Sequence, residues 1–191
     1  MPRLPPTEIR LRRTEHADIQ LLHAIGSDEE SNRLAGTKPR DWPSFLARWS
    51  SILADTDGSS TRVTPRVIEA DGVFVGSINI FPQDQLDSIG YWVARAHWGR
   101  GIASAAVALL LRECPTRPLH ATVAGHNLAS IHILQKHGFA IVDRRMTPET
   151  ELAQARESVT LVLRSGMARS SDGVKRVRWW VSRSAHDRSS R

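Results

Sequence analysis

Hydrophobic and polar residues alternate along several short stretches of the chain, the pattern of strands that bury one face. Ile9 and Leu11, for example, alternate with polar neighbours near the N-terminus. Seven stretches that alternate in this way, or that are short apolar runs, predict strands over residues 8–13, 62–70, 73–81, 88–94, 119–124, 139–142 and 159–163. Asp71-Gly72 between the second and third of these predicts a hairpin turn.

Apolar residues recur every three or four positions in other stretches, which is the period of a helix. They predict helices over residues 16–25, 43–53, 101–111 and 127–137, while residues 55–60 and 82–87 are expected to form loops. The third helix is apolar on most of its surface and should be buried. The resulting order, β-α-α-β-β-β-α-β-α-β-β, predicts an α/β domain with a mixed sheet.

The composition fits a soluble, folded domain. Of the 191 residues, 40% are hydrophobic and 24% charged, which is ordinary for globular proteins. The single cysteine, Cys114, excludes an internal disulfide framework and a zinc site made of several cysteines. No apolar run is long enough to cross a membrane, and the charged N-terminus lacks the apolar segment of a signal peptide. We therefore expect a cytoplasmic protein with no membrane partner.

The formal charge of +6 is concentrated at the C-terminal end. Residues 165–191 hold seven basic and two acidic side chains, whereas residues 1–164 are nearly balanced, at +1. We therefore expect a folded domain over residues 1–164 and a basic, disordered tail over 165–191. An electrostatic arm for RNA, a ribosome or a membrane surface is the alternative for the tail, but no specific nucleic-acid partner is expected.

The stretch with the clearest chemistry is a strand followed by a glycine-containing turn and a helix. Gly99 and Gly101 permit unusual backbone angles, and the helix that follows offers free N–H groups at its positive dipole end. Such a turn suits a phosphate or pyrophosphate. It matches neither a Walker loop nor a complete Gly-x-Gly-x-x-Gly motif, because Ser104 takes the third glycine position. A tight turn without a ligand is the alternative.

A second informative segment, residues 127–139, follows the next predicted strand. Together the two segments are similar to the GNAT family of acetyl-CoA-dependent N-acetyltransferases, and most to its branch acting on ribosomal-protein N-termini. The family's pyrophosphate signature, Gln/Arg-x-x-Gly-x-Gly/Ala, corresponds to Trp98-Gly-Arg-Gly-Ile-Ala103, with Trp98 in place of the usual Gln or Arg. Its later signature matches Asn127, Ser130, Leu134, Lys136, Gly138 and Phe139. The resemblance covers roughly residues 8–164.

This resemblance implies a fold, a co-substrate and a set of binding residues. The expected fold is a mixed, mostly antiparallel sheet with helices on both faces and central strands splayed at the cofactor site. Acetyl-CoA is the implied co-substrate, attacked directly by an amine, with no metal. The backbone of Trp92 and Val93 would bind pantetheine and face the developing oxyanion, and Asn127 would hold the pantetheine arm. The pyrophosphate would be held by Trp98, Gly99, Arg100, Gly101, Ile102, Ala103 and Ser104.

The catalytic residues are less clearly marked. Leu134 stands where many family members have a proton-donating tyrosine, so Ser130 is the candidate for that role, with helix packing as its alternative. Many family members use a carboxylate on the strand before the turn as the base, so the resemblance makes Asp87, at the start of that strand, the candidate here, with a solvated acid as its alternative and Asp84 and Glu149 as further candidates. Tyr91 alternates with apolar residues and is expected in the core.

The acceptor implied by these residues is an amine that deprotonates readily, above all a peptide N-terminus. A small molecule such as an aminoglycoside is the alternative, for which Asp28-Glu29-Glu30 would supply an acidic cleft. A non-catalytic acyl-CoA-binding module and a nucleic-acid-binding protein are alternatives of other classes. The sequence leaves open whether the enzyme is a monomer or a homodimer.

Overall fold

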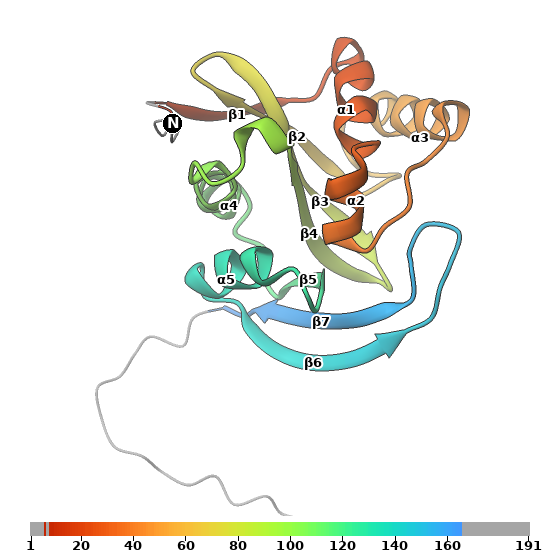
Figure 1. The fold of residues 1–191 in the computed structure, drawn as a ribbon. Coiled ribbons are helices and arrows are strands. Elements are labelled where there is room, and N and C mark those ends of the chain that lie inside the picture. Colours follow the sequence, from red (N-terminus) through yellow and green to blue (C-terminus); the bar gives the residue numbers. More distant parts are fainter. Residues whose placement is uncertain (1–5, 7, 166–191) are drawn as a thin grey trace, which may run out of the picture.

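Seven strands form one sheet in the computed structural model, which describes residue 6 and residues 8–165 (Figure 1). The strands are β1 (Ile9–Arg13), β2 (Thr64–Ala70), β3 (Val73–Gln83), β4 (Leu86–Val93), β5 (Leu119–Ala124), β6 (Ala140–Thr147) and β7 (Arg156–Leu163). Their order in the sheet is β1-β2-β3-β4-β5-β7-β6, and only the β4–β5 pair is parallel. Apart from Ser165, the predicted tail lies outside the described residues.

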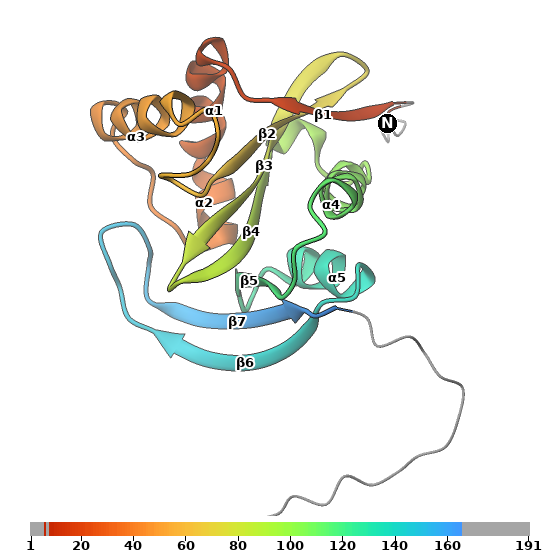
Figure 2. The ribbon, with the colours of Figure 1, turned by 180° about the vertical axis from the view of Figure 1, so that it is seen from behind.

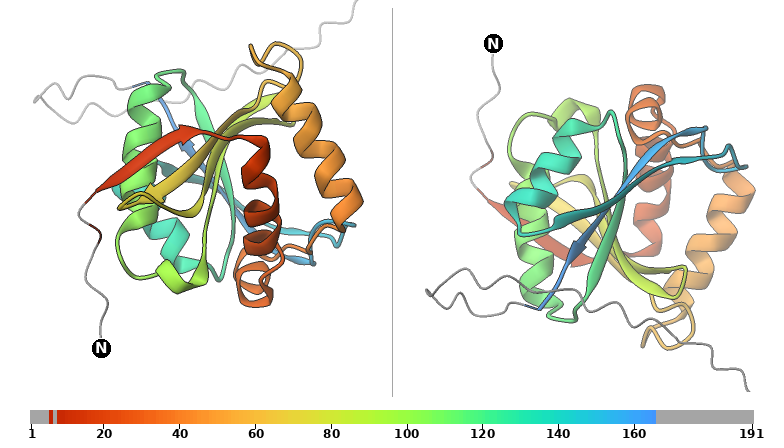
Figure 3. Two further views of the ribbon diagram at one scale, coloured as in Figure 1. Left: turned by 90° about the horizontal axis from the view of Figure 1, so that it is seen from above. Right: turned by 90° about the horizontal axis from the view of Figure 1, so that it is seen from below.

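Helices cover both faces of this sheet, as Figures 2 and 3 show. They are α1 (Ile19–Gly26), α2 (Glu29–Ala35), α3 (Trp42–Ala54), α4 (Ile102–Glu113) and α5 (Leu128–Lys136), with short 3-10 helices η1 (His16–Asp18) and η2 (Arg95–His97). Helices α4 and α5 lie on one face, and α1 to α3 lie on the other. The predicted α/β class, mostly antiparallel sheet and two-sided helical cover are confirmed. No helix in the described part of the chain could span a membrane.

Two hydrophobic clusters hold these layers together. The larger lies under α4 and α5, where four residues of α4 are at most 1% exposed: Ile102, Ala106, Val107 and Leu110. The smaller one lies between the other face and its helices, and is formed by Ile19, Leu22, Trp49 and Ile52. The apolar period seen in the sequence therefore predicts correctly the buried face of α4, whereas Leu46 of α3 and Leu128 of α5, which lie on predicted apolar faces, are exposed.

Helix α2 is absent from the elements that the sequence predicts. Its seven residues contain one large apolar residue, Leu34, and so they carry no helical stripe. Local capping defines it instead, because Asp28 accepts a hydrogen bond from the Ser31 N–H at 2.9 Å, and Gly36 ends the helix in the left-handed conformation. Such short helices leave little signal beyond their caps.

Four strands, β3, β4, β6 and β7, are longer than the sequence indicates. The predicted loop 82–87 is a tight hairpin, because Asp84 and Gln85 have φ angles of 50° and 66° that fit a two-residue turn. Strand β6 continues to Thr147 rather than ending at residue 142. It lies at the edge of the sheet and is largely exposed, so no apolar alternation marks it.

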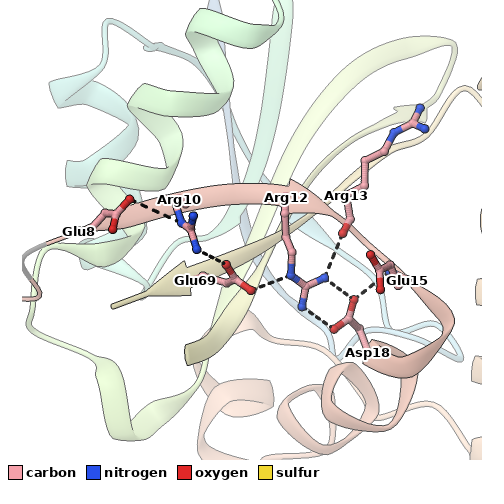
Figure 4. A network of polar contacts seen from close by, with 7 residues as sticks. All are labelled: Glu8, Arg10, Arg12, Arg13, Glu15, Asp18 and Glu69. Carbon is pink, nitrogen blue, oxygen red and sulfur yellow. Dashed lines mark hydrogen bonds and ion pairs between the residues drawn. The ribbon is translucent and has the colours of Figure 1, made fainter. Parts of the chain in front are cut away.

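A network of charged side chains ties β1, η1 and β2 together at one edge of the sheet (Figure 4). The Arg12 guanidinium donates to both carboxylate oxygens of Asp18, at 2.7 and 2.8 Å, and its Nε donates to Glu69 at 2.7 Å. Asp18 is only 5% exposed and also accepts a hydrogen bond from the backbone N–H of Glu15 at 2.8 Å. The hydrogen bonds from Arg12 lower the pKa of Asp18 below its ordinary value, with Glu15 adding to the effect.

Asp18→Asn is expected to lower the free energy of unfolding by about 2–3 kcal/mol at pH 7, because it removes the buried carboxylate that accepts two hydrogen bonds from Arg12 and leaves Glu69 as the only anionic partner of Arg12 among the described residues. Since the folded-state pKa of Asp18 is depressed, its contribution is present above the unfolded-state value of about 3.9 and declines as pH falls below it. Urea unfolding at pH 7 and pH 3 should therefore show the difference from wild type shrinking at pH 3. Asp143→Asn, in an exposed pair 3.8 Å from Arg145, is the control and should change stability by under about 0.5 kcal/mol. An Asp18 effect no larger than the control would contradict this prediction.

Candidate active site

The two central strands, β4 and β5, separate toward the end of β4 that leads into the glycine-containing turn. Strands β4 and β5 share a single register pair, Ser88 with His120, and diverge beyond it. The N–H of Ala94 donates to the Val75 carbonyl at 2.8 Å, so the backbone groups of Ala94 point toward β3. Because these directions alternate along an antiparallel pair, the N–H and C=O groups of Tyr91 and Val93 point away from β3, into the opening between β4 and β5.

One cavity, here called the cofactor cleft, lies between the end of β4, the turn into α4 and helix α5. Its volume is about 450 Å³. All ten residues predicted to bind the cofactor line it: Trp92, Val93, Trp98, Gly99, Arg100, Gly101, Ile102, Ala103, Ser104 and Asn127. The structure thus gathers into one cleft residues from a strand, a turn and two helices.

The turn offers the donors that a phosphate group needs. Gly99 and Gly101 have φ angles of 72° and 77°, and a Cβ at either position would meet no atom within 4 Å. The first helical bond runs from the Ala105 N–H to the Gly101 carbonyl at 3.0 Å, so the N–H groups of residues 102–104 have no acceptor within the helix. These amides stand at the positive end of the α4 dipole and line the cleft, which fits the pyrophosphate of a coenzyme A molecule.

Trp98, which departs from the usual first residue of the signature, has a clear structural role. Its indole N–H donates to the Val93 carbonyl at 2.7 Å and so fastens the turn to the end of β4. The Val93 carbonyl is therefore already paired, whereas the Val93 N–H, like that of Tyr91, faces the opening as a donor. On the opposite side, the Trp92 indole donates to the Ile25 carbonyl of α1 at 2.6 Å.

A second cavity, here called the acceptor cavity, adjoins the cofactor cleft and also has a volume of about 450 Å³. It lies between α1, α3, β4, β5 and the segment that joins β6 to β7, and Leu134 is among its lining residues. Five residues line both cavities and mark their junction: Ala35, Tyr91, Trp92, Asn127 and Ser130. An acyl group carried along the cleft would meet an acceptor at this junction.

Tyr91 carries the most acidic hydroxyl at the junction. Its hydroxyl donates to the Ser130 carbonyl over 3.5 Å, a long contact, and burial raises the pKa of Tyr91. Asn127 accepts the Ser130 N–H through Oδ1 at 3.1 Å, which fixes the start of α5 at the same place. Tyr91 does pack against the core, as its alternation predicts, but the sequence did not show that it reaches both cavities. It is the only tyrosine of the chain.

The acidic residues considered from the sequence lie elsewhere. Asp87 pairs with Arg62 at 2.6 Å and lines neither cavity. Of the Asp28-Glu29-Glu30 segment, Asp28 caps α2 and Glu30 pairs with Arg33 at 2.6 Å, and no residue of the segment lines the acceptor cavity. Among the described residues, no three His, Cys, Asp or Glu side chains form a group that could hold a metal ion.

The sequence matches one family model, described as an acetyltransferase (GNAT) domain, over residues 8–140. No curated protein sequence matches it. Among solved structures, RimJ of Mycobacterium smegmatis, in complex with CoA-disulfide, is similar with a TM-score of 0.65 and 27% identity, over 85% of each chain.

Two further solved structures share the fold at lower identity. One is a Salmonella typhimurium acetyltransferase that modifies the N-terminal serine of ribosomal protein L7/L12, with a TM-score of 0.66, 16% identity and coverage of 84% of this chain and 96% of that chain. The other is the spermidine N-acetyltransferase of Vibrio cholerae in complex with CoA and spermine, with a TM-score of 0.69, 14% identity and coverage of 83% and 96%. These acceptors differ in class, so the acceptor cavity of this chain has to be considered on its own residues.

Proposed function

The chain belongs to the GNAT family of acetyltransferases, and on that premise we propose that it acetylates the free α-amine of a peptide or protein N-terminus. The enzyme is an N-acetyltransferase with acetyl-CoA as its co-substrate. The observation that carries the choice of acceptor is the absence of Asp and Glu from the described residues lining the acceptor cavity.

In this proposal the cofactor cleft binds through backbone donors. The N–H groups of residues 102–104 hold the pyrophosphate, and the left-handed Gly99 and Gly101 let the turn approach it closely. Asn127, whose Oδ1 caps α5, keeps its amide nitrogen for the pantetheine arm. The Val93 N–H donates to a carbonyl oxygen held in the opening between β4 and β5. Acetyl-CoA supplies the acetyl thioester.

The acceptor amine must lose a proton before it can attack. With no carboxylate in the cavity lining, the positive side chains there disfavour the charged ammonium and so favour its deprotonation. An α-amine with a pKa of 7.7–8.0 needs only about 1–1.4 kcal/mol to become neutral at pH 7, against about 4.6 kcal/mol for a lysine amine near 10.4. The α-amine therefore suits a cavity without a base.

The departing thiolate needs a proton, and we assign its delivery to the Tyr91 hydroxyl. As the amine nitrogen bonds to the acetyl carbon and the carbon–sulfur bond breaks, the Tyr91 proton moves to the sulfur. The acceptor nitrogen, which carries an extra proton after the attack, releases that proton to solvent. A proton from solvent then restores the Tyr91 hydroxyl. Tyr91 suits this better than Ser130, because a phenol is far more acidic than an alkyl hydroxyl, although Ser130 lies at the same junction.

A pair of matched peptides tests the proposed acceptor. A peptide with a free N-terminus and no lysine should be acetylated at least about tenfold faster than the same sequence N-blocked and carrying one lysine, because far more of its amine is neutral at pH 7. Release of free thiol gives the rate, and mass spectrometry locates the acetyl group. Equal rates, or acetylation of the lysine peptide alone, would contradict the proposal. Acetyl-CoA binding without turnover of any amine would favour a non-catalytic module instead.

A further inference from the structure

The Lys, Arg, Asp and Glu side chains that line the acceptor cavity are all of one sign, positive. Three cationic side chains line it, Lys38, Arg40 and Arg156, and none of its described lining residues is acidic. Lys38 is paired with Glu149, which lies outside the lining. Arg40 and Arg156 have no ion pair with any described residue, so two positive charges remain uncompensated around the place where the acceptor enters.

Arg156 is held in place without being neutralised. Its Nη1 donates to the backbone carbonyls of Gly36 and Gln154, and its Nε is buried with no hydrogen-bond acceptor among the described residues. A Cβ at Gly36 would come within 2.2 Å of the Arg156 Cδ, so glycine at that position makes room for this side chain. Burial lowers the pKa of Arg156, but an arginine stays charged at neutral pH.

The three cations lie on a rim of the acceptor cavity formed by residues 36–40 and 152–156, and backbone hydrogen bonds hold these two segments together. Thr37 forms a bridge with Ala153, the Lys38 N–H donates to the Leu152 carbonyl at 2.9 Å, and the Gln154 N–H donates to the Gly36 carbonyl at 3.0 Å. These bonds join the segment after α2 to the segment before β7. The same rim continues to Arg40, whose carbonyl pairs with the His23 ring at 3.1 Å. The cations therefore stand on fixed backbone.

We propose that this cavity selects N-termini followed by acidic residues, with Arg156 and Arg40 as the specificity-determining residues. The inference rests on the proposed function, since it concerns the peptide segment that follows the reacting α-amine. Because Nη1 is held by backbone carbonyls and Nε is buried, the Arg156 guanidinium presents Nη2 to the cavity, where it can donate a charge-assisted hydrogen bond to a carboxylate. The same charges repel polycationic amines, which disfavours an aminoglycoside or polyamine acceptor.

Three peptides that differ only in charge test this inference. They begin Ser-Asp-Asp, Ser-Asn-Asn and Ser-Lys-Lys, with identical neutral residues after that and a blocked C-terminus. We expect kcat/KM to fall in that order, with the acidic peptide about tenfold better than the neutral one, and the preference to shrink as salt is added. The lysine amines are dimethylated so that only the α-amine reacts.

Variants of the two arginines test whether the acceptor cavity causes the preference for the acidic peptide. Arg156→Gln should reduce the acidic-to-neutral ratio of kcat/KM toward one. Because Arg156 also contacts Gly36, Arg40→Gln serves as a second variant in case the first does not fold, and should reduce the same ratio. Arg33→Gln is the matched control, because Arg33 is exposed, pairs with Glu30 and lies outside the lining. Its ratio should equal that of wild type.

The outcomes separate this inference from the function on which it rests. Equal kcat/KM for all three peptides would overturn the acidic preference while supporting α-amine acetylation. Failure to acetylate any of them, with turnover on other amines, would overturn the proposed function. An acidic preference that persists unchanged in folded Arg156→Gln and Arg40→Gln would overturn the assignment to these two residues.

Discussion

Gly101→Glu is expected to weaken acetyl-CoA binding at least about a hundredfold while the protein stays folded. Gly101 has a φ of 77°, which a side chain rarely adopts, and it directly precedes the N–H groups assigned to the pyrophosphate. A carboxylate there would stand beside phosphate charges, and two like charges about 5 Å apart repel by about 3 kcal/mol at an effective dielectric constant of 20. Isothermal titration calorimetry measures the affinity.

Gly72→Glu is a closely matched control for this variant. Gly72 has a φ of 78°, and a Cβ there would also meet no atom within 4 Å, but it lies in the turn between β2 and β3 and lines neither cavity. Both variants therefore bear the same backbone strain and the same added charge. Their circular dichroism should match wild type, and only Gly101→Glu should lose affinity. Equal affinities for acetyl-CoA in the two folded variants would refute the assignment of the turn to the pyrophosphate.

Tyr91→Phe is expected to lower kcat by about a hundredfold to a thousandfold, within the range that general acids contribute. The change removes one oxygen atom and keeps the ring that packs against the core. Because the Tyr91 hydroxyl makes only a 3.5 Å contact with the Ser130 carbonyl, its loss should leave the fold and the acetyl-CoA affinity nearly unchanged. Stopped-flow or steady-state thiol release gives kcat, and calorimetry gives the affinity.

Ser130→Ala separates the two hydroxyls at the junction. If Tyr91 donates the proton, the serine variant should slow turnover by much less than the tyrosine variant. If Ser130 donates it, as the sequence alone had suggested, the order of the two effects reverses. A Tyr91→Phe enzyme with wild-type kcat would show that the phenol has no part in the reaction.

The sequence by itself identified the residues that line the cofactor cleft. All ten residues that the family resemblance implies line this one cleft, because the cleft is built largely from one continuous stretch of chain. A strand end, two glycines with positive φ and a helix start are adjacent in the chain, so their geometry follows from short-range backbone preferences. The seven-stranded sheet was predicted for a similar reason, since alternation marks each strand that buries one face.

Only the tertiary structure decided the acceptor side. Alternation placed Tyr91 on an inward face but could not show that this face opens onto a cavity where β4 and β5 part. The family resemblance made Asp87 the candidate base, whereas the fold pairs that carboxylate with Arg62 outside the lining of both cavities. Arg156 and Gly36 are 120 residues apart and meet only through the rim. Contacts between distant segments depend on how the layers pack, and periodicity along one segment carries no information about the segment that will cover it.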